Sequence, residues 1–74
     1  MDPFYRGELK RLLGAGVANH ASWQLIKRRL RALSEGWRAG KQPGAPTKDE
    51  TEAFLEEHRE WYEMNVAIAL RGLD

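Results

Sequence analysis

Cysteine is absent from this chain of 74 residues. Its absence excludes a disulfide and a metal site built on thiolates. A monomer of this length buries only about 60% of the surface that its unfolded chain exposes, so its core must be thin. A small fold without such covalent or metal links gains its stability from well-packed elements or from a second chain. We therefore expect oligomerisation.

Long apolar runs are also absent. No stretch approaches the roughly 20 apolar residues of a membrane span. The first ten residues, MDPFYRGELK, lack the basic and then apolar layout of a signal peptide. We therefore expect a cytoplasmic protein that does not contact a membrane.

The residues that enzymes use are scarce. The chain has no cysteine nucleophile and no glycine-rich phosphate loop after a strand, and its two histidines, His20 and His58, belong to different expected helices. Ser22 lies two residues from His20, but neighbouring positions on a helix point apart and cannot form a catalytic triad. The sequence therefore predicts no catalytic residue, no enzymatic activity and no cofactor.

A metal site at His58 is not predicted either, although several glutamates surround this histidine. The helical metal pattern places Glu three residues before His, where this chain has Leu55, and the zinc-protease pattern places a second His four residues away, where it has Tyr62. We instead expect His58 to be one of two polar positions that fix the register of an otherwise apolar line. That line consists of Phe54, His58, Trp61, Asn65 and Ile68.

The charges are unevenly distributed, although the net charge is only +1. Residues 1–46 carry nine Lys/Arg and three Asp/Glu, whereas residues 47–74 carry three Lys/Arg and eight Asp/Glu. We expect the two halves to attract each other, with Arg28, Arg31 and Arg38 approaching the glutamate-rich face. A second interpretation of the acidic cluster is mimicry of nucleic acid, which a nearly neutral chain does not favour.

The first expected helix covers residues 3–13. Asp2 can accept a free backbone N–H at the helix start, and Pro3 suits the first helical position because it has no N–H. The glycines of the segment GAG at 14–16 supply flexible backbone that can end the helix.

The second expected helix covers residues 20–36. Either Asn19 or Ser22 can cap its start, and Gly36 is a plausible stop. The glycines and prolines of RAGKQPGAP then predict a loop at 37–47.

The third expected helix covers residues 48–71. Thr47 and Glu50 form a capping-box pattern, in which each side chain satisfies a backbone donor of the other residue. We expect Gly72 to close the helix in the left-handed conformation and Leu73 to fold back onto the last turn. The predicted fold is thus a single all-α domain over 1–74, in which a short N-terminal helix accompanies a two-helix antiparallel hairpin that dimerises into a bundle.

The third helix carries the strongest indication of a contact surface. Its segment MNVAIAL at 64–70 is apolar on every side except Asn65, and such a helix must be covered on every side. Large aromatic side chains dominate interface energetics. We therefore expect a homodimer, a partner interface or both. The predicted contact residues are Trp23, Trp37, Phe54, Trp61, Tyr62, Met64 and Ile68.

The second helix carries a basic face. Its apolar residues Trp23, Ile26, Leu30, Leu33 and Trp37 form a seam. Lys27, Arg28 and Arg31 lie on the opposite side, and we expect them to act as an electrostatic rim that steers a protein partner. The alternative is a small DNA-binding transcriptional regulator that uses the basic helix 22–36, because that spacing also suits base and phosphate contacts. The connection at 14–22 is longer than the usual helix-turn-helix turn.

In its size, its lack of cysteine, its helical hairpin and its exposed aromatic residues, the chain resembles small early proteins of phages of high-GC bacteria. The resemblance implies a protein that binds and inhibits a host protein, such as a regulator, a motor ATPase or a defence complex. It extends over the whole chain and assigns no functional residue. The expected function is a non-enzymatic protein-protein interaction module that inhibits or regulates a host protein.

Overall fold

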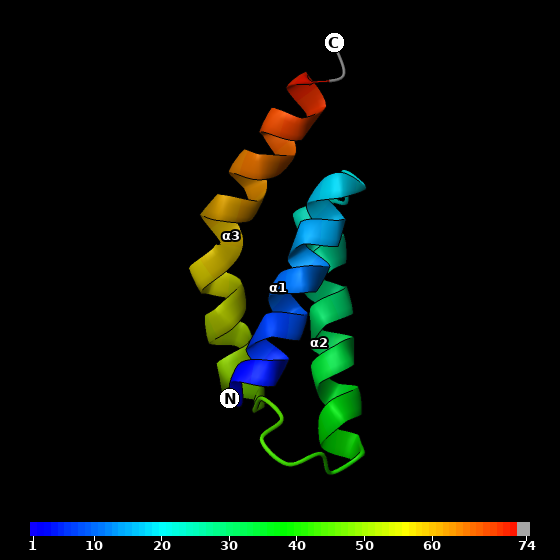
Figure 1. Cartoon of the computed structure of the whole chain (residues 1–74), viewed down its shortest axis with the longest axis vertical. Helices are drawn as coiled ribbons and strands as arrows, with labels where there is room; N and C mark the ends of the chain where they lie inside the picture. The colour runs from blue at the N-terminus through cyan, green and yellow to red at the C-terminus, as the bar shows by residue number, and fades with distance from the viewer. Residues whose placement is uncertain (73–74) are drawn as a thin grey trace.

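The computed structural model describes residues 1–72, which form three helices: α1 (Pro3–Ala18), α2 (Trp23–Ala39) and α3 (Lys48–Arg71). The described part of the chain contains no strand, so the predicted all-helical class is confirmed. Figure 1 shows α1 and α2 side by side along the first part of α3, which extends beyond both of them at its C-terminal end. The molecule is therefore elongated, with extents of 45 × 19 × 18 Å.

All three helix starts follow from capping side chains. Asp2 accepts a hydrogen bond of 2.9 Å from the backbone N–H of Phe4, and Ser22 accepts one of 3.2 Å from Leu25. The predicted capping box is present at the start of α3, where the Thr47 hydroxyl accepts from the Glu50 N–H and the Glu50 carboxylate accepts from the Thr47 N–H. Each cap satisfies a backbone donor that the first helical turn leaves free.

The predicted end of α1 is wrong, because the helix continues through the GAG segment to Ala18. Glycine permits a helix to end but does not force it to do so. The chain turns at His20, whose φ of 55° is left-handed. The N–H of Ala21 then donates to the Gly16 carbonyl and the N–H of His20 donates to the Val17 carbonyl, at 2.9 and 3.1 Å. These are the two bonds of a Schellman motif, here built on histidine in place of glycine.

The bounds of α2 also differ from the prediction of 20–36, because the helix begins after the cap at Ser22 and ends at Ala39. Trp37, which was expected at the start of the loop, is therefore helical. A second Schellman motif ends α2, with Lys41 at a φ of 54° and a bond of 3.1 Å from the Gln42 N–H to the Trp37 carbonyl.

The observed bounds of α3 match the predicted helix at 48–71. Gly72, however, has a φ of −66° and is right-handed, so the predicted left-handed closing position is wrong. Its N–H donates to the Ile68 carbonyl at 3.2 Å, which simply continues the helical hydrogen bonding. The expected folding back of Leu73 lies outside the described residues.

The core lies where all three helices meet. Contacts between α2 and α3 include a hydrogen bond of 3.0 Å between the buried hydroxyls of Ser34 and Thr51, and these small side chains allow a close approach of the two helices. The buried apolar side chains are Tyr5, Leu9, Leu13, Ala21, Ile26, Leu30, Phe54, Leu55 and Tyr62.

Tyr62 fixes α3 against the turn between α1 and α2. Its buried hydroxyl donates a hydrogen bond of 2.6 Å to the Ala21 carbonyl. Gly16 makes room for this arrangement, because a Cβ at that position would lie 2.5 Å from Ile26 Cδ1 and 2.7 Å from the Tyr62 hydroxyl oxygen. The glycine that was expected to end α1 instead serves helix packing.

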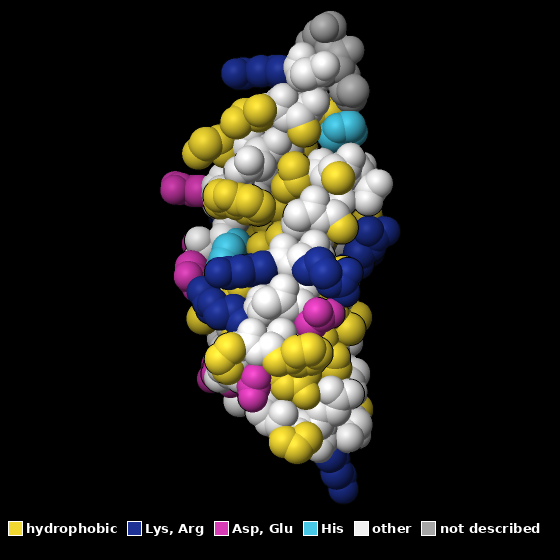
Figure 2. Space-filling view, in the orientation of Figure 1, with side chains coloured by type: hydrophobic (Ala, Val, Ile, Leu, Met, Phe, Trp, Pro, Cys, Tyr) yellow, Lys and Arg dark blue, Asp and Glu magenta, His cyan; other side chains and the backbone are white. Residues whose placement is uncertain are grey.

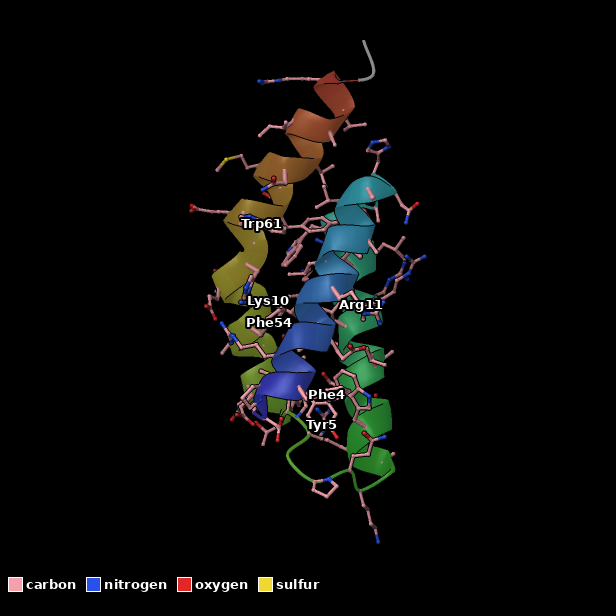
Figure 3. The ribbon with its side chains drawn as sticks, in the orientation of Figure 1. Phe4, Tyr5, Lys10, Arg11, Phe54 and Trp61 are labelled. Carbon is pink, nitrogen blue, oxygen red and sulfur yellow. The ribbon has the colours of Figure 1, made fainter. Side chains whose placement is uncertain are left out.

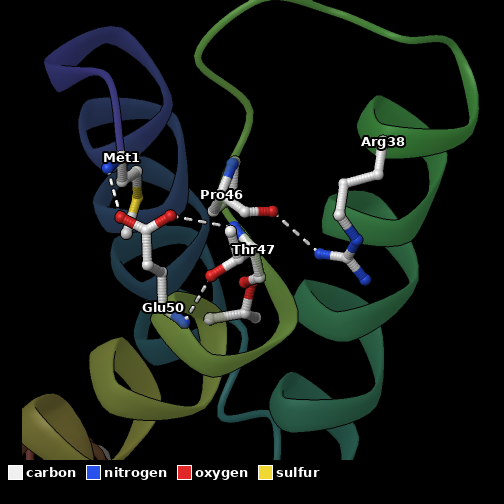
Figure 4. A network of polar contacts seen from close by, with 6 residues as sticks. Met1, Arg38, Pro46, Thr47 and Glu50 are labelled. Atoms are coloured by element: carbon white, nitrogen blue, oxygen red, sulfur yellow. Dashed lines mark hydrogen bonds and ion pairs between the residues drawn. The ribbon is translucent and has the colours of Figure 1, made fainter.

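The opposite end of the bundle is held by polar contacts from the N-terminus and the loop (Figure 4). The Met1 amino group pairs with the Glu50 carboxylate, which also accepts from Thr47. Arg38 at the end of α2 donates a hydrogen bond of 2.9 Å to the Pro46 carbonyl. The start of α3 is therefore tied both to the N-terminus and to α2.

Candidate protein-interaction surface

The C-terminal half of α3 exposes three large apolar side chains on one face. Trp61 is 47% exposed, Met64 59% and Ile68 57%. Their spacings of three and four residues place them along one side of the helix, and we refer to these three residues as the α3 strip. At its C-terminal end α3 extends past α1 and α2, and Figure 2 shows hydrophobic side chains gathered over this upper part of the molecule.

A groove of about 390 Å³ lies at the N-terminal end of the α3 strip, between α1 and α3. It is lined by Lys10, Leu13, His58 and Trp61. Figure 3 shows Lys10 on α1 and Trp61 on α3 on the face turned towards the reader. The His58 ring stacks on Phe54 at 4.0 Å between centroids, and its Nδ1 lies 2.8 Å from the Phe54 carbonyl oxygen. Leu13 and Trp61 thus form apolar walls of the groove, and Lys10 adds a positive charge. The fourth lining residue is His58, whose imidazole is held by its contacts with Phe54.

Two of the predicted contact residues lie in the core instead of at the surface. Phe54 and Tyr62, which were expected to contact a partner, are each only 1% exposed, so this structure presents neither side chain at its surface. Both lie on the face of α3 that α1 and α2 cover. The periodicity of the sequence did not distinguish this covered face from the α3 strip beside it.

The two remaining predicted tryptophans occupy the edges of the core. Trp23 packs against Tyr62, with ring centroids 5.3 Å apart, and Trp37 packs against Tyr5 at 4.7 Å. Both are partly buried. Of the seven predicted contact residues, the structure therefore brings Trp61, Met64 and Ile68 together on an exposed face.

The basic face of α2 is partly occupied by contacts within the chain. Arg31 makes two hydrogen bonds to Glu52 on α3, of 2.9 and 2.6 Å, which hold the pKa of the Glu52 carboxyl below its ordinary value. Lys27 is partly buried and Arg28 is exposed. Of the predicted electrostatic rim, Arg31 is therefore engaged with Glu52 of α3 within the chain.

The predicted attraction between the charged halves is confirmed at two sites. Arg31 pairs with Glu52, and Arg6 on α1 pairs with Glu57 on α3 at 2.7 Å. Arg6 also lies over the Phe54 ring, 5.4 Å from its centroid. Arg38 departs from the prediction, because it donates to the Pro46 carbonyl instead of a glutamate.

A second groove, of about 550 Å³, runs between α2 and α3 and has charges of both signs. Arg31, Arg38 and Lys48 contribute positive charge, while Glu35 and Glu52 contribute negative charge and interrupt the basic surface. A nucleic-acid site instead presents a continuous basic surface to the phosphates. This groove therefore does not favour the DNA-binding alternative.

Within residues 1–72, no group of three His, Asp or Glu side chains is arranged to hold a metal ion. None of the described helices combines the length and the apolar character that crossing a membrane requires.

Sequence reasoning missed Lys10 and Leu13, which contribute the α1 side of the groove beside Trp61. Their spacing of three residues places them on one face of a helix, but nothing in the sequence indicated that this face meets α3.

Comparisons of the chain with protein-family models, curated proteins and solved structures found no match.

Proposed function

We propose that this chain is a non-enzymatic protein-interaction module that binds its partner through the α3 strip. The observation that carries the proposal is the exposure of Trp61, Met64 and Ile68 along one face of α3. Contiguous exposed apolar surface of this kind marks interaction sites on small proteins. Tryptophan and methionine are also enriched in the centres of interfaces.

The surroundings of the α3 strip suit an interface. Glu57 and Glu60 precede it along α3, and Lys10 lies across the groove from Trp61. Such charges at a rim mainly orient and accelerate association, whereas desolvated apolar anchors hold the complex together. In this proposal the partner is a host protein whose surface the module occupies and thereby blocks.

The proposal is tested by capturing partners from the native host with the wild-type chain and with a variant of the strip. In the variant, Met64→Gln and Ile68→Gln replace two exposed apolar side chains without entering the core. Phe4→Gln is the matched control, because Phe4 is an exposed large apolar residue on α1, 65% exposed, and lies outside the strip. Bound proteins are identified by mass spectrometry, purified and titrated against each variant.

We expect the strip variant to lose at least tenfold in affinity for the purified partner, since losing two interface anchors costs more than about 1.4 kcal/mol. The Phe4→Gln control should bind like the wild type. A partner that binds both variants equally would contradict the proposal. Duplex DNA binding at physiological salt that disappears on reversing Lys27, Arg28 and Arg31 to Glu, in a variant that keeps its helical content, would instead support the DNA-binding alternative.

A further inference from the structure

We infer that a second copy of this chain covers the α3 strip, with the two α3 helices packed antiparallel. The inference rests on the proposed function, because it uses the same exposed surface and names one occupant for it. In this arrangement the dimer shelters the strip until a competing partner displaces the second copy.

The spacing of residues along α3 indicates a seam that packs against another helix. Glu57, Trp61, Met64, Ile68 and Arg71 follow one another at intervals of four, three, four and three residues. This is the repeat of a helix seam that packs against another helix, and here its three central positions are apolar and exposed. Glu57 contacts Arg6 of α1, but Trp61, Met64 and Ile68 stay 47–59% exposed, so a helix of another copy can pack on them.

The distribution of charge along α3 indicates the direction of the second copy. Every acidic residue of α3 lies at or before Glu63, while Arg71 is the only charged residue in the rest of the helix. A parallel pair would place the acidic residues of the two copies opposite one another, which is destabilising. An antiparallel pair places Arg71 of each copy beside the acidic stretch of the other. Charge complementarity therefore favours a second copy in the antiparallel direction.

The antiparallel pairing also allows a register in which apolar residues face apolar residues. When Met64 faces Ile68 of the second copy, Trp61 faces Arg71 of the second copy. An arginine over a tryptophan ring gains a cation–π interaction, and Glu60 lies one residue away to receive the same guanidinium. Apolar pairs therefore occupy the centre of the interface and complementary polar pairs close both ends, as two-fold symmetry requires.

The shape of the molecule leaves space for this contact. α3 extends past α1 and α2, as Figure 1 shows, so an antiparallel copy places its own bundle at the opposite end of the shared segment. The last turn of the second copy then reaches the groove beside Lys10, Leu13 and Trp61. The groove and the α3 strip thus form one continuous surface for the second copy.

Cysteine crosslinking tests the direction of the two helices. Because the sequence contains no cysteine, every disulfide must form between the introduced residues. Glu60→Cys and Arg71→Cys are prepared as separate variants, both at exposed positions where folding is not at risk. In the antiparallel register the two Glu60 positions are about 18 Å apart along the axis and the two Arg71 positions about 15 Å apart, from the 1.5 Å rise per residue. A disulfide needs Cβ atoms roughly 4 Å apart.

We expect a disulfide-linked dimer only when the two variants are mixed before oxidation. Crosslinking of either variant with itself would show a parallel pair and overturn the inference. Absence of any crosslink, together with a wild-type mass of 8.5 kDa at high concentration in sedimentation equilibrium, would overturn it as well.

Charge reversal provides an independent measurement. Arg71→Glu or Glu60→Arg removes two cross-copy pairs from each dimer and introduces like charges, so each should weaken dimerisation by roughly tenfold. Combining the two reversals should restore most of the affinity, whereas a double variant as weak as the singles would contradict the pairing. A monomeric chain that still binds a host protein through the strip would overturn only this inference. A dimer that captures no host protein through the strip would instead contradict the proposed function alone.

Discussion

Two glycines of α1, only two residues apart, have opposite roles. A Cβ on Gly14 would meet nothing within 4 Å, whereas a Cβ on Gly16 would collide with Ile26 and Tyr62. Gly14→Ala should therefore stabilise the fold by about 0.5–1 kcal/mol, because glycine inside a helix loses more conformational entropy on folding. Gly16→Ala should destabilise it by about 1–3 kcal/mol through overpacking.

Chemical denaturation of the two alanine variants measures both effects under the same conditions. Because each variant adds one methyl group to the same helix, each is the control for the other. Equal effects of the two substitutions would show that Gly16 does not form the close contact described here.

The left-handed residues that end α1 and α2 offer a second test at this scale. His20 and Lys41 adopt φ values near 55°, which cost a side-chain-bearing residue roughly 1–2 kcal/mol. Glycine avoids this cost but loses about 0.5–1 kcal/mol in backbone entropy. His20→Gly and Lys41→Gly should therefore each raise stability by about 0.5–1 kcal/mol in thermal unfolding.

Gly44 is the matched control for these two positions, because it is left-handed, with a φ of 76°, and is already a glycine. Gly44→Ala should lower stability, both for the backbone conformation and for the close approach of Asp2 Cβ, 2.8 Å from an added Cβ. If His20→Gly lowered stability as well, contacts of the histidine side chain would have to stabilise the fold by more free energy than the left-handed backbone costs.

At the scale of the helices, ion pairs make the docking of α3 dependent on pH. Hydrogen bonds from Arg31 and from Arg6 lower the pKa values of Glu52 and Glu57 from their ordinary value of 4.5. A carboxyl with a lowered pKa in the folded state contributes stability above its unfolded pKa, and this contribution is lost as pH falls through the folded value. We therefore expect the unfolding midpoint to fall progressively below about pH 4.5.

Glu52→Gln isolates one of these contributions. Its side chain has nearly the same shape but does not titrate, so the decrease in its unfolding midpoint between about pH 6 and about pH 3 should be smaller than that of the wild type. Glu56→Gln is a suitable control, because Glu56 is exposed on the same helix and takes part in none of the ion pairs that join α3 to α1 or α2 within residues 1–72. Identical pH profiles for Glu52→Gln and the wild type would contradict a role of the Arg31 pair.

The sequence predicted helix starts better than helix ends, for a physical reason. A start depends on local capping chemistry, and Asp2 and Thr47 perform the expected role, while Ser22, one of the two expected candidates, caps α2. An end depends on which residue the surrounding packing forces into the left-handed conformation. His20 and Lys41 fill those positions although glycines stand nearby, so composition alone placed both ends too early.

At the scale of the whole molecule, the sequence predicted that α3 has more apolar surface than one chain covers, but it did not show where. Phe54 and Tyr62 were assigned to the interface, yet the packing of α1 and α2 buries both. Trp61, Met64 and Ile68 lie beside that buried face. Dividing the aromatic residues between core and surface requires the position of α1 relative to α3, which no local pattern contains.

The thin core of a chain this small gives the proposed dimer a direct effect on stability. Because association stabilises only the folded state, the unfolding midpoint of the wild type should rise as its concentration is increased from about 10 µM to about 1 mM. The Met64→Gln and Ile68→Gln variant should unfold at the same midpoint throughout this range, since its core is unchanged and its exposed strip is polar. The Phe4→Gln control should follow the wild type. A wild-type midpoint that does not change with concentration would mean that folding and self-association are not linked, and α3 would then keep its exposed strip for other partners.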